Sequence, residues 1–327
     1  MSASRLSLAS IEPLRACEGG RIVLHGGSFP VDVGLPRVTL GGVSARVAFA
    51  SPRRLVVIVP AELEGGSTPI RFDNHPGETA FVTIGAPWAT GLHQVDNPVF
   101  DRDGNLYVTY SGSRGQEAPV SIFRVTRQGT REPFASGIVN ATSMVMGPDG
   151  HLYVSSRFEG AVYRVNSDGS HEIVASDLGV ACGLAFDRDG WLYVGDRSGT
   201  VFRVRDGKAS AFATLPASIA AFHLAMSPND ELFVAAPTLG AYDAVYRIDR
   251  HGEVTTLPYV FGRPQGIAFD PGGTPYVVDA LAGASGLYRL GGGSPELTAA
   301  GATLVGVAFG PQGELVIASN ETAYRFD

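Results

Sequence analysis

Basic charge is scarce in this chain. Of its 327 residues, 25 are Lys or Arg and 32 are Asp or Glu, so the net charge is -7, and Lys208 is the single lysine. The excess of acid falls within residues 87–327, and no stretch carries a basic stripe. Because a protein that binds nucleic acid must neutralise several phosphates, this composition argues against nucleic acid as a partner.

Cysteine and long apolar runs are equally scarce. The two cysteines, Cys17 and Cys182, lie far apart in sequence, which excludes a disulfide framework and disfavours a structural zinc site. No apolar run is long enough to span a bilayer, so we expect no membrane partner. The first residues, MSASRLSLASIEPLRACEGG, lack the apolar centre of a secretory signal, and the expected location is cytoplasmic.

The chain is rich in glycine, with 42 residues, and in short alternating apolar stretches that repeat. One copy reads GLAFDRDGWLYVGDRSGTVFRV over residues 183–204. A Leu-Tyr-Val-like core marks each copy and begins at Leu106, Leu152, Leu192, Leu232, Pro275 and Leu315. A period of about forty residues with four apolar stretches is typical of a propeller blade. The sequence therefore predicts a six-bladed β-propeller over residues 87–327.

Turn residues support this repeat and leave its last copy incomplete. Pairs such as Asp103-Gly104 and Asp149-Gly150 supply the positive φ that a tight hairpin needs. The last copy offers only VGVAFG, ELVIAS and TAYRFD, which make three strands. WATGLHQVD (88–96) aligns with FASGIVNAT (134–142), the outer strand of the first copy. We therefore expect residues 88–92 to complete blade six, since an open ring would leave two unpaired edges.

Residues 1–86 lie outside the repeat and predict a small immunoglobulin-like β-sandwich. Their short strands alternate with Gly and Pro turns. The segment resembles the IPT/TIG family in Ile11-Glu12-Pro13, the Gly19-Gly20 pair, and the stretches LHGGSF, VTLGG, SPRRLVVIVP and FVTIG. That resemblance implies a module that contacts a protein partner or packs against the propeller.

Two stretches of the propeller resemble known repeat families. RPQGIAFDPGGTPYVVDA (263–280) is similar to the NHL repeat, and DNPVFDRDGNLYV (96–108) is similar to the opening of the gluconolactonase and senescence-marker family. Together the resemblances cover residues 88–327. They imply the propeller fold, and the second implies a hydrolase with a divalent cation, calcium or magnesium.

We expect a ligand site at one rim of the ring. The residues just before the first strand and just after the second strand of each blade share this face, where long loops converge. The candidate substrate-binding residues are Asn97, Thr142, Ser143, Gln265, Arg157, Arg197 and Tyr110. The forked guanidinium groups of Arg157 and Arg197 suit a carboxylate or sugar acid, although they could equally be solvated surface groups.

The gluconolactonase resemblance implies a metal site on the same rim. Its three ligand positions fall on Asp96, Cys182 and Phe222, of which only Asp96 offers an oxygen. A hard cation needs several oxygen ligands. The alternative is a shifted site built from Asp96, Asn97, Gln265 and main-chain carbonyls.

Asp96, His223 and Cys182 are the candidate catalytic residues. Cys182 and His223 take neighbouring rim positions in adjacent blades, and a thiol beside an imidazole is a pattern of nucleophilic catalysis. The alternative is structural, because a free cysteine is usually a buried small apolar residue. Asp196 and Asp279 each follow a second strand and are predicted to bond loop amides rather than to act in catalysis.

Two functions follow from these patterns. The first is a gluconolactonase-like hydrolase that acts on a lactone or ester of a small sugar-like molecule at the tunnel mouth. The second is a non-catalytic propeller that binds a small molecule, a carbohydrate or a protein. The largely neutral rim favours the second, because it offers few groups for proton transfer.

Overall fold

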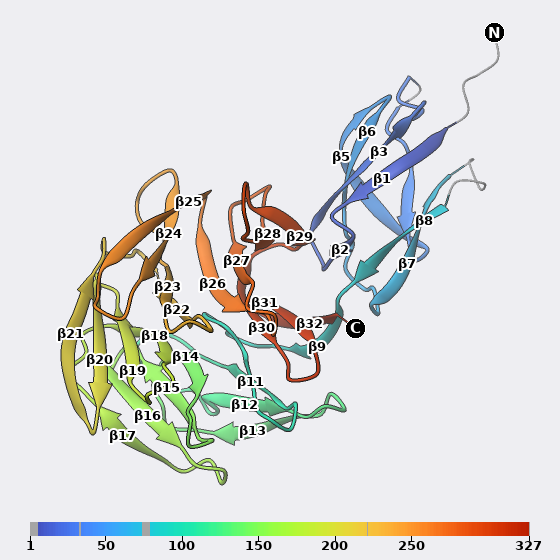
Figure 1. Ribbon diagram of the computed structural model, residues 1–327. Coiled ribbons are helices and arrows are strands. Elements are labelled where there is room, and N and C mark those ends of the chain that lie inside the picture. Colours follow the sequence, from blue (N-terminus) through green and yellow to red (C-terminus); the bar gives the residue numbers. More distant parts are fainter. Residues whose placement is uncertain (1–5, 33, 74–78, 221, 327) are drawn as a thin grey trace.

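The computed structural model describes residues 6–32, 34–73, 79–220 and 222–326. Within these residues the chain forms strands and no helix, which confirms the predicted all-β class. The described part accordingly holds no helix that is long and apolar enough to cross a membrane. Figure 1 shows a ring of twisted sheets, with a smaller group of strands drawn in blue attached at one side.

Most of the ring consists of four-stranded sheets that form propeller blades. Among the described residues, five such sheets are separate, with strand orders β10-β11-β12-β13, β14-β15-β16-β17, β18-β19-β20-β21, β22-β23-β24-β25 and β30-β31-β32-β9. Their bounds are β10 (Val99–Phe100), β11 (Leu106–Thr109), β12 (Ile122–Val125), β13 (Arg131–Ala135), β14 (Ala141–Met146), β15 (Leu152–Ser156), β16 (Ala161–Val165), β17 (His171–Ala175), β18 (Ala181–Phe186), β19 (Leu192–Asp196), β20 (Thr200–Arg205), β21 (Lys208–Thr214), β22 (His223–Met226), β23 (Leu232–Ala235), β24 (Asp243–Ile248), β25 (Val254–Phe261), β30 (Leu304–Phe309), β31 (Leu315–Ser319), β32 (Thr322–Phe326) and β9 (Ala86–Thr90).

The first two strands of a blade are joined by a tight turn. Gly104 and Gly150 have φ angles of 82° and 81°, in the left-handed region where glycine has no steric penalty. The positive φ predicted at these turns is thereby confirmed.

A further set of four strands departs from the predicted pattern of six separate blades. β26 (Pro264–Phe269), β27 (Pro275–Asp279), β28 (Gly286–Arg289) and β29 (Glu296–Ala300) pair antiparallel in chain order. They belong, however, to a twelve-stranded sheet that continues through β2 (Arg15–Ala16) into the beginning of the chain. The reason is a parallel pairing between Ala16 and Ala300, to which the amide of Cys17 adds a 2.8 Å bond to the carbonyl of Ala300. Among the described residues, five blades are therefore separate sheets, rather than the six that the repeat predicts.

The same sheet joins the strands at the beginning of the chain to the propeller. The remaining strands at the beginning of the chain are β1 (Ser7–Glu12), β3 (Arg21–Gly27), β4 (Val38–Leu40), β5 (Val43–Ser51), β6 (Arg54–Ile58), β7 (Gly66–Phe72) and β8 (Thr79–Ile84). They surround an apolar cluster that includes Leu24, Leu55 and Ile70, and Ala300 of the propeller joins it. Because β2 pairs with both β8 and β29, hydrogen bonds run unbroken from this group into the ring.

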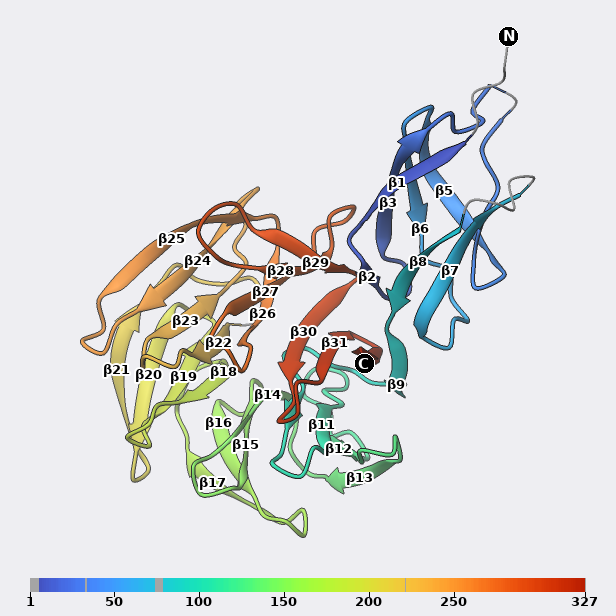
Figure 2. The same ribbon diagram turned by 45° about the vertical axis from the view of Figure 1, so that its right-hand side comes forward.

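The ring is closed by β9, which follows β8 directly. β9 pairs antiparallel with β32 and aligns Ala89 with Ala323 and Thr90 with Thr322. The paired residues are 86–90, two residues earlier than the expected segment 88–92, although the amide of Leu92 still bonds to the carbonyl of Glu321 at 3.0 Å. Figure 2 shows β9 beside the last strands of the chain.

The first strands of the blades line a channel along the axis of the ring. A cavity of about 380 Å³ is bounded there by residues 97–100, 144–146, 184–186, 224–226, 267–269 and 307–309. The strands approach each other closely at one end, where a Cβ on Gly266 would lie 2.7 Å from the Cα of Gly306. This close approach brings the residues before each first strand together at the axis.

The pairing of β9 with β32 leads to a prediction on stability. Ala89 is 4% exposed and packs in an apolar cluster with Leu92 and Val316, so a charge there would be buried without a partner. We expect Ala89→Asp to lower the free energy of unfolding by about 3 kcal/mol or more, measured by urea denaturation. The neighbouring side chain of Thr90 is exposed, and Thr90→Asp should change stability by less than about 0.5 kcal/mol. Equal unfolding midpoints for both variants would show that β9 is not needed.

Candidate functional site

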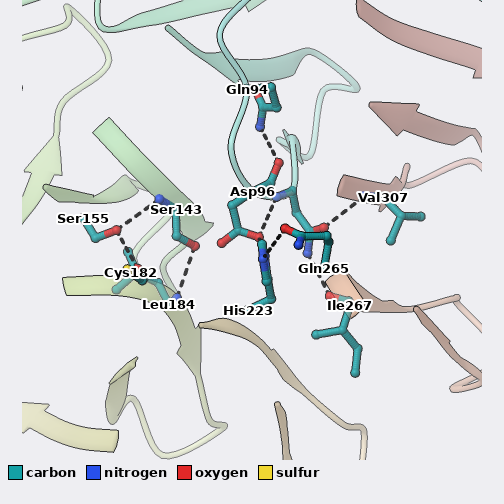
Figure 3. Close-up of polar contacts among 11 residues, drawn as sticks. Gln94, Asp96, Ser143, Ser155, Cys182, Leu184, His223, Gln265, Ile267 and Val307 are labelled. Carbon is teal, nitrogen blue, oxygen red and sulfur yellow. Dashed lines mark hydrogen bonds and ion pairs between the residues drawn. The ribbon is translucent and has the colours of Figure 1, made fainter. Parts of the chain in front are cut away.

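Three polar side chains from separate segments meet at the axis of the ring (Figure 3). Asp96 lies between β9 and β10, His223 begins β22, and Gln265 is the second residue of β26. Nδ1 of His223 lies 2.6 Å from Oδ1 of Asp96, and Nε2 lies 3.2 Å from Oε1 of Gln265. His223 is fully buried and Asp96 is 2% exposed. The fold thus brings together three of the residues singled out from the sequence.

Two neighbouring amide side chains fix this group in place. The side-chain amide of Gln94 donates to the carbonyl of Asp96 at 2.7 Å, while its oxygen accepts from the amide of Thr109 at 2.8 Å. Asn97 donates from Nδ2 to the carbonyl of Ile267 at 2.8 Å and accepts at Oδ1 from the amide of Val307 at 2.9 Å. We call Gln94, Asp96, Asn97, His223 and Gln265 the axis network. Its bonds tie the segment that follows β9 to β11, β22, β26 and β30.

Asp96 and His223 form a buried hydrogen-bonded pair at the centre of the axis network. Both atoms that face the imidazole ring are oxygens, and each lies within hydrogen-bond distance of a ring nitrogen of His223. Oδ1 of Asp96 accepts a second bond, at 2.7 Å, from the amide of Asn97. Oδ2 has no hydrogen-bond partner among the described residues. Oδ1 of this carboxylate therefore accepts hydrogen bonds from the protein, whereas Oδ2 accepts none from the described residues.

The expected pairing between Cys182 and His223 does not form, which corrects the nucleophile hypothesis. The thiol of Cys182 donates to the carbonyl of Val180 at 3.3 Å, whereas His223 contacts Asp96 and Gln265. Burial raises the pKa of the Cys182 thiol to about 12, and the charge of Asp96 acts in the same direction. At neutral pH the thiol is therefore protonated, and a protonated thiol is a poor nucleophile.

The residues at the expected metal position do not fit a hard cation. Cys182 and Phe222 supply no oxygen, and His223 occupies Oδ1 of Asp96. The oxygens of the alternative site are also engaged, since Asn97 Oδ1 accepts from Val307 and Gln265 Oε1 contacts His223. No group of three or more His, Cys, Asp or Glu side chains in the described part of the chain is arranged to hold a metal ion. We accordingly assign no chemistry to a metal.

Several other rim residues have structural partners within the protein. The hydroxyl of Thr142 donates to the carbonyl of Asn140 at 2.8 Å. Ser143 accepts at Oγ from the amide of Leu184 at 3.2 Å, and its own amide donates to Ser155 Oγ at 3.0 Å. The half-buried ring of Tyr110 lies edge-on to His93, with 6.1 Å between ring centroids. These side chains are placed on the expected rim, and their contacts stay within the protein.

Asp196 and Asp279 bind backbone amides, as predicted. Oδ1 of Asp196 accepts from the amide of Val180 at 2.8 Å. Asp279 accepts from the amides of Arg263 and Leu281 at 2.8 and 3.0 Å. Each carboxylate therefore anchors the loop that precedes a first strand to the end of the second strand.

Arg157 and Arg197 lie in an open cavity beside the axis network. The cavity has a volume of about 810 Å³ and spans three neighbouring blades. We call it the rim cavity, and its lining is Arg114, Asn140, Arg157, Phe158, Gly179, Val180, Asp196, Arg197, Ser198, Ala217 and Ser218. The thiol of Cys182 bonds to the carbonyl of Val180, which lines the cavity, so this thiol lies beside the cavity.

Arg114, Asn140 and Phe158 complete this lining and were missed by the sequence reasoning. Arg114 lies in the long loop YSGSRGQEAPVS of the first blade, and Phe158 directly follows Arg157. The signal that would have found Arg114 is an arginine in a long loop on the same rim as two others. Asn140 offers no such signal, because its role depends on a contact with that distant loop.

Comparisons with known proteins agree with this architecture. A family model described as strictosidine synthase-like, N-terminal, matches residues 183–204, and a comparison with curated proteins found no match. Among solved structures, an auxiliary nutrient binding protein from Bacteroides thetaiotaomicron aligns with a TM-score of 0.57 at 13% identity, over 98% of this chain and 97% of that chain. A candidate gluconolactonase aligns with a TM-score of 0.59 at 18% identity, over 74% and 91%.

A third similar structure is a catalytically inactive variant of virginiamycin B lyase from Staphylococcus aureus with quinupristin. It aligns with a TM-score of 0.53 at 13% identity, over 100% of this chain and 96% of that chain. At such identities the likeness concerns the fold, because propellers carry many unrelated activities. The chain is a β-propeller protein, and its function has to be argued from its own site.

The axis pair generates a prediction on stability. Removing one partner of this buried pair leaves the other polar side chain without its hydrogen bond and away from water. We expect Asp96→Asn and His223→Gln each to lower the free energy of unfolding by about 3 kcal/mol, measured by urea denaturation. In a double-mutant cycle the two changes should be coupled by about 1 kcal/mol or more. Strictly additive effects would mean that the two side chains do not interact.

The buried thiols generate a prediction on reactivity. Burial raises the pKa of both Cys17 and Cys182 to about 12, so neither forms appreciable thiolate at pH 8. In a Cys17→Ala variant, where Cys182 is the single thiol, we expect no iodoacetamide adduct by mass spectrometry in native buffer and one adduct in urea. Because the pKa is raised, reactivity of the native thiol should appear only as the pH approaches 12. Rapid native alkylation of Cys182 at pH 8 would instead restore the nucleophile hypothesis.

Proposed function

We propose that this chain is a binding propeller that takes a small-molecule ligand in the rim cavity and does not turn it over. The observation that carries the proposal is a contrast between neighbouring groups. The acid–base groups at the axis are buried and bonded to the protein, whereas the rim cavity beside them is open and lined by polar side chains. A polar cavity of this size suits a small ligand.

The proposed architecture extends the fold described above. β26–β29 serves as a sixth blade of the ring, because its strand order and antiparallel pairing match those of the other blades. The group formed by residues 6–84 serves as an immunoglobulin-like module of the IPT/TIG kind, held against that blade by β2. The auxiliary nutrient binding protein supports this interpretation of binding, since it aligns along nearly the whole of both chains.

A gluconolactonase-like hydrolase that acts on a lactone or ester of a sugar-like molecule is the second candidate. It is favoured by the 2.6 Å contact between Asp96 and His223 and by Oδ2 of Asp96, which has no partner among the described residues. A carboxylate–imidazole pair is a general-base arrangement when it can reach a water molecule. The likeness to a candidate gluconolactonase supports the same proposal at the level of the fold.

A hydrolysis assay separates the two candidates. We expect the full chain to hydrolyse glucono-δ-lactone and p-nitrophenyl acetate no faster than buffer, whether calcium, magnesium or EDTA is present. The measurement is initial rate by pH-stat and by absorbance. A rate above the blank that Asp96→Asn abolishes would replace the binding function with the hydrolase.

Binding itself needs a separate measurement on the same protein. We expect at least one class among sugars, sugar acids, nucleotides and aromatic acids to raise the thermal unfolding midpoint, because a ligand that binds only the folded state stabilises it. A chain that neither hydrolyses these esters nor responds to any of these classes would overturn the proposal.

A further inference from the structure

The rim cavity gathers positive charge that the protein itself does not neutralise. Arg114, Arg157 and Arg197 line it, and no ion pair in the described part of the chain involves any of them. Elsewhere in the propeller, arginines meet acids directly, as in the contacts of Arg124 with Glu132 at 2.5 Å and of Arg289 with Glu296 at 2.6 Å. The three cavity arginines therefore differ from these two paired arginines of the blade surfaces.

The carboxylate in the lining does not neutralise these charges. Among the described lining residues, Asp196 is the single acid, and it accepts bonds from the amide of Val180 and the hydroxyl of Ser198. Its orientation is fixed by the loop that it anchors. One carboxylate against three guanidinium groups leaves a net positive charge in the cavity.

The arginines also repel one another. Arg157 is half-buried, and burial lowers its pKa, while the charges of Arg197 and Arg114 act in the same direction. Arg114 and Arg197 are exposed, and like charges gathered around one cavity are unfavourable unless a counter-charge joins them. An anion between these groups would remove that repulsion.

The loop that carries Arg114 is held in position before any ligand binds. Asn140 accepts at Oδ1 from the amide of Gly115 at 2.7 Å and donates from Nδ2 to the carbonyls of Ser111 and Ser113 at 2.6 and 2.9 Å. A Cβ on Gly115 would lie 2.8 Å from the ring of Phe158, so the loop lies directly against that ring. A preorganised site loses less entropy when it binds.

Phe158 adds an apolar surface to this charged cavity. Its side chain is 55% exposed although it lines the cavity, so part of its ring is open to a ligand. Aromatic rings stack favourably on flat apolar groups, and guanidinium groups bind carboxylates and phosphates through paired hydrogen bonds. A guanidinium group and an aromatic ring lie on adjacent residues of one loop, Arg157 and Phe158.

We infer that the rim cavity binds an organic anion that consists of a carboxylate or phosphate joined to a flat apolar group. The carboxylate or phosphate contacts the three arginines, and the apolar group packs on Phe158. This inference rests on the proposed binding function and names the class of its ligand. The planar, forked guanidinium groups of the arginines bind such anions more tightly than neutral polyols of similar size.

Calorimetric titration of the full chain tests the ligand class. The probes are phenylacetate and phenyl phosphate, with the neutral phenylacetamide as the matched control. We expect the anions to bind and phenylacetamide to bind at least about tenfold more weakly, with affinity falling as salt is added. Phenyl phosphate and phenylacetate also show which anionic group is preferred.

Variants assign the contacts. Arg114→Gln, Arg157→Gln and Arg197→Gln should each weaken binding of phenyl phosphate about tenfold, whereas Arg188→Gln should not. Arg188 is the matched control, because it is exposed and its guanidinium lies 3.5 Å from Asp230, outside the cavity lining. Phe158→Ala should weaken phenyl phosphate and leave inorganic phosphate unchanged.

A stability measurement separates a ligand site from structural arginines. Arg157→Met keeps much of the apolar stem and removes the charge, so without ligand it should unfold at the same temperature as the parent or a higher one. A structural role would lower that temperature. Loss of stability in Arg157→Met, or equal binding of phenylacetamide and the anions, would overturn the inference while leaving the binding function standing. If no probe of any class binds, both fail.

Discussion

The structure depends on a strand that the chain contributes from the start of its propeller to the last blade. β9 pairs with β32, and the segment that follows runs directly to the axis, where Asp96 meets His223 and Gln265. Asn97 and Gln94 then bond to main-chain groups of other blades. The pairing of β9 with β32 therefore places Asp96 and Asn97 at the axis. The hydrogen bonds that these two residues form there in turn stabilise the closed ring.

Polar groups on this face are treated in two opposite ways. At the axis, the side chains of Asp96, His223 and Gln265 bond to one another in a buried setting, where a polar group without a partner would be costly. In the rim cavity, Arg114, Arg157 and Arg197 have no ion-pair partner among the described residues. The first arrangement serves the fold. The second is unfavourable for the protein alone, and for that reason it points to an external ligand.

The group of strands at the beginning of the chain is connected to the ring by β-sheet hydrogen bonds and not by a linker alone. β2 lies between β8 and β29, so main-chain hydrogen bonds continue from one part to the other. β8 also leads within two residues into β9. A movement of this group would therefore be transmitted both to the sheet that contains β26–β29 and to the strand that closes the ring.

Much of the fold was determined by local sequence pattern. The period of about forty residues, the alternation of apolar residues and the glycine turns each depend on neighbouring residues, and each appears in the structure as expected. The same patterns predicted that the residues before each first strand share one rim. They could not reveal that β29 accepts Ala16 as an edge partner, because that pairing joins residues nearly three hundred positions apart.

The site was determined by sequence only in part. Sequence placed six candidate residues on one face, because each lies either at the start of a first strand or just after a second strand of the repeat: Asp96, Cys182, His223, Gln265, Arg157 and Arg197. Tertiary structure decided which of them touch, since His223 contacts Asp96 rather than Cys182. It also brought Arg114 into the cavity that Arg157 lines, on a loop held by Asn140. The physical reason is that partner choice depends on distances between blades, which no single repeat encodes, whereas strand and turn are encoded within each repeat.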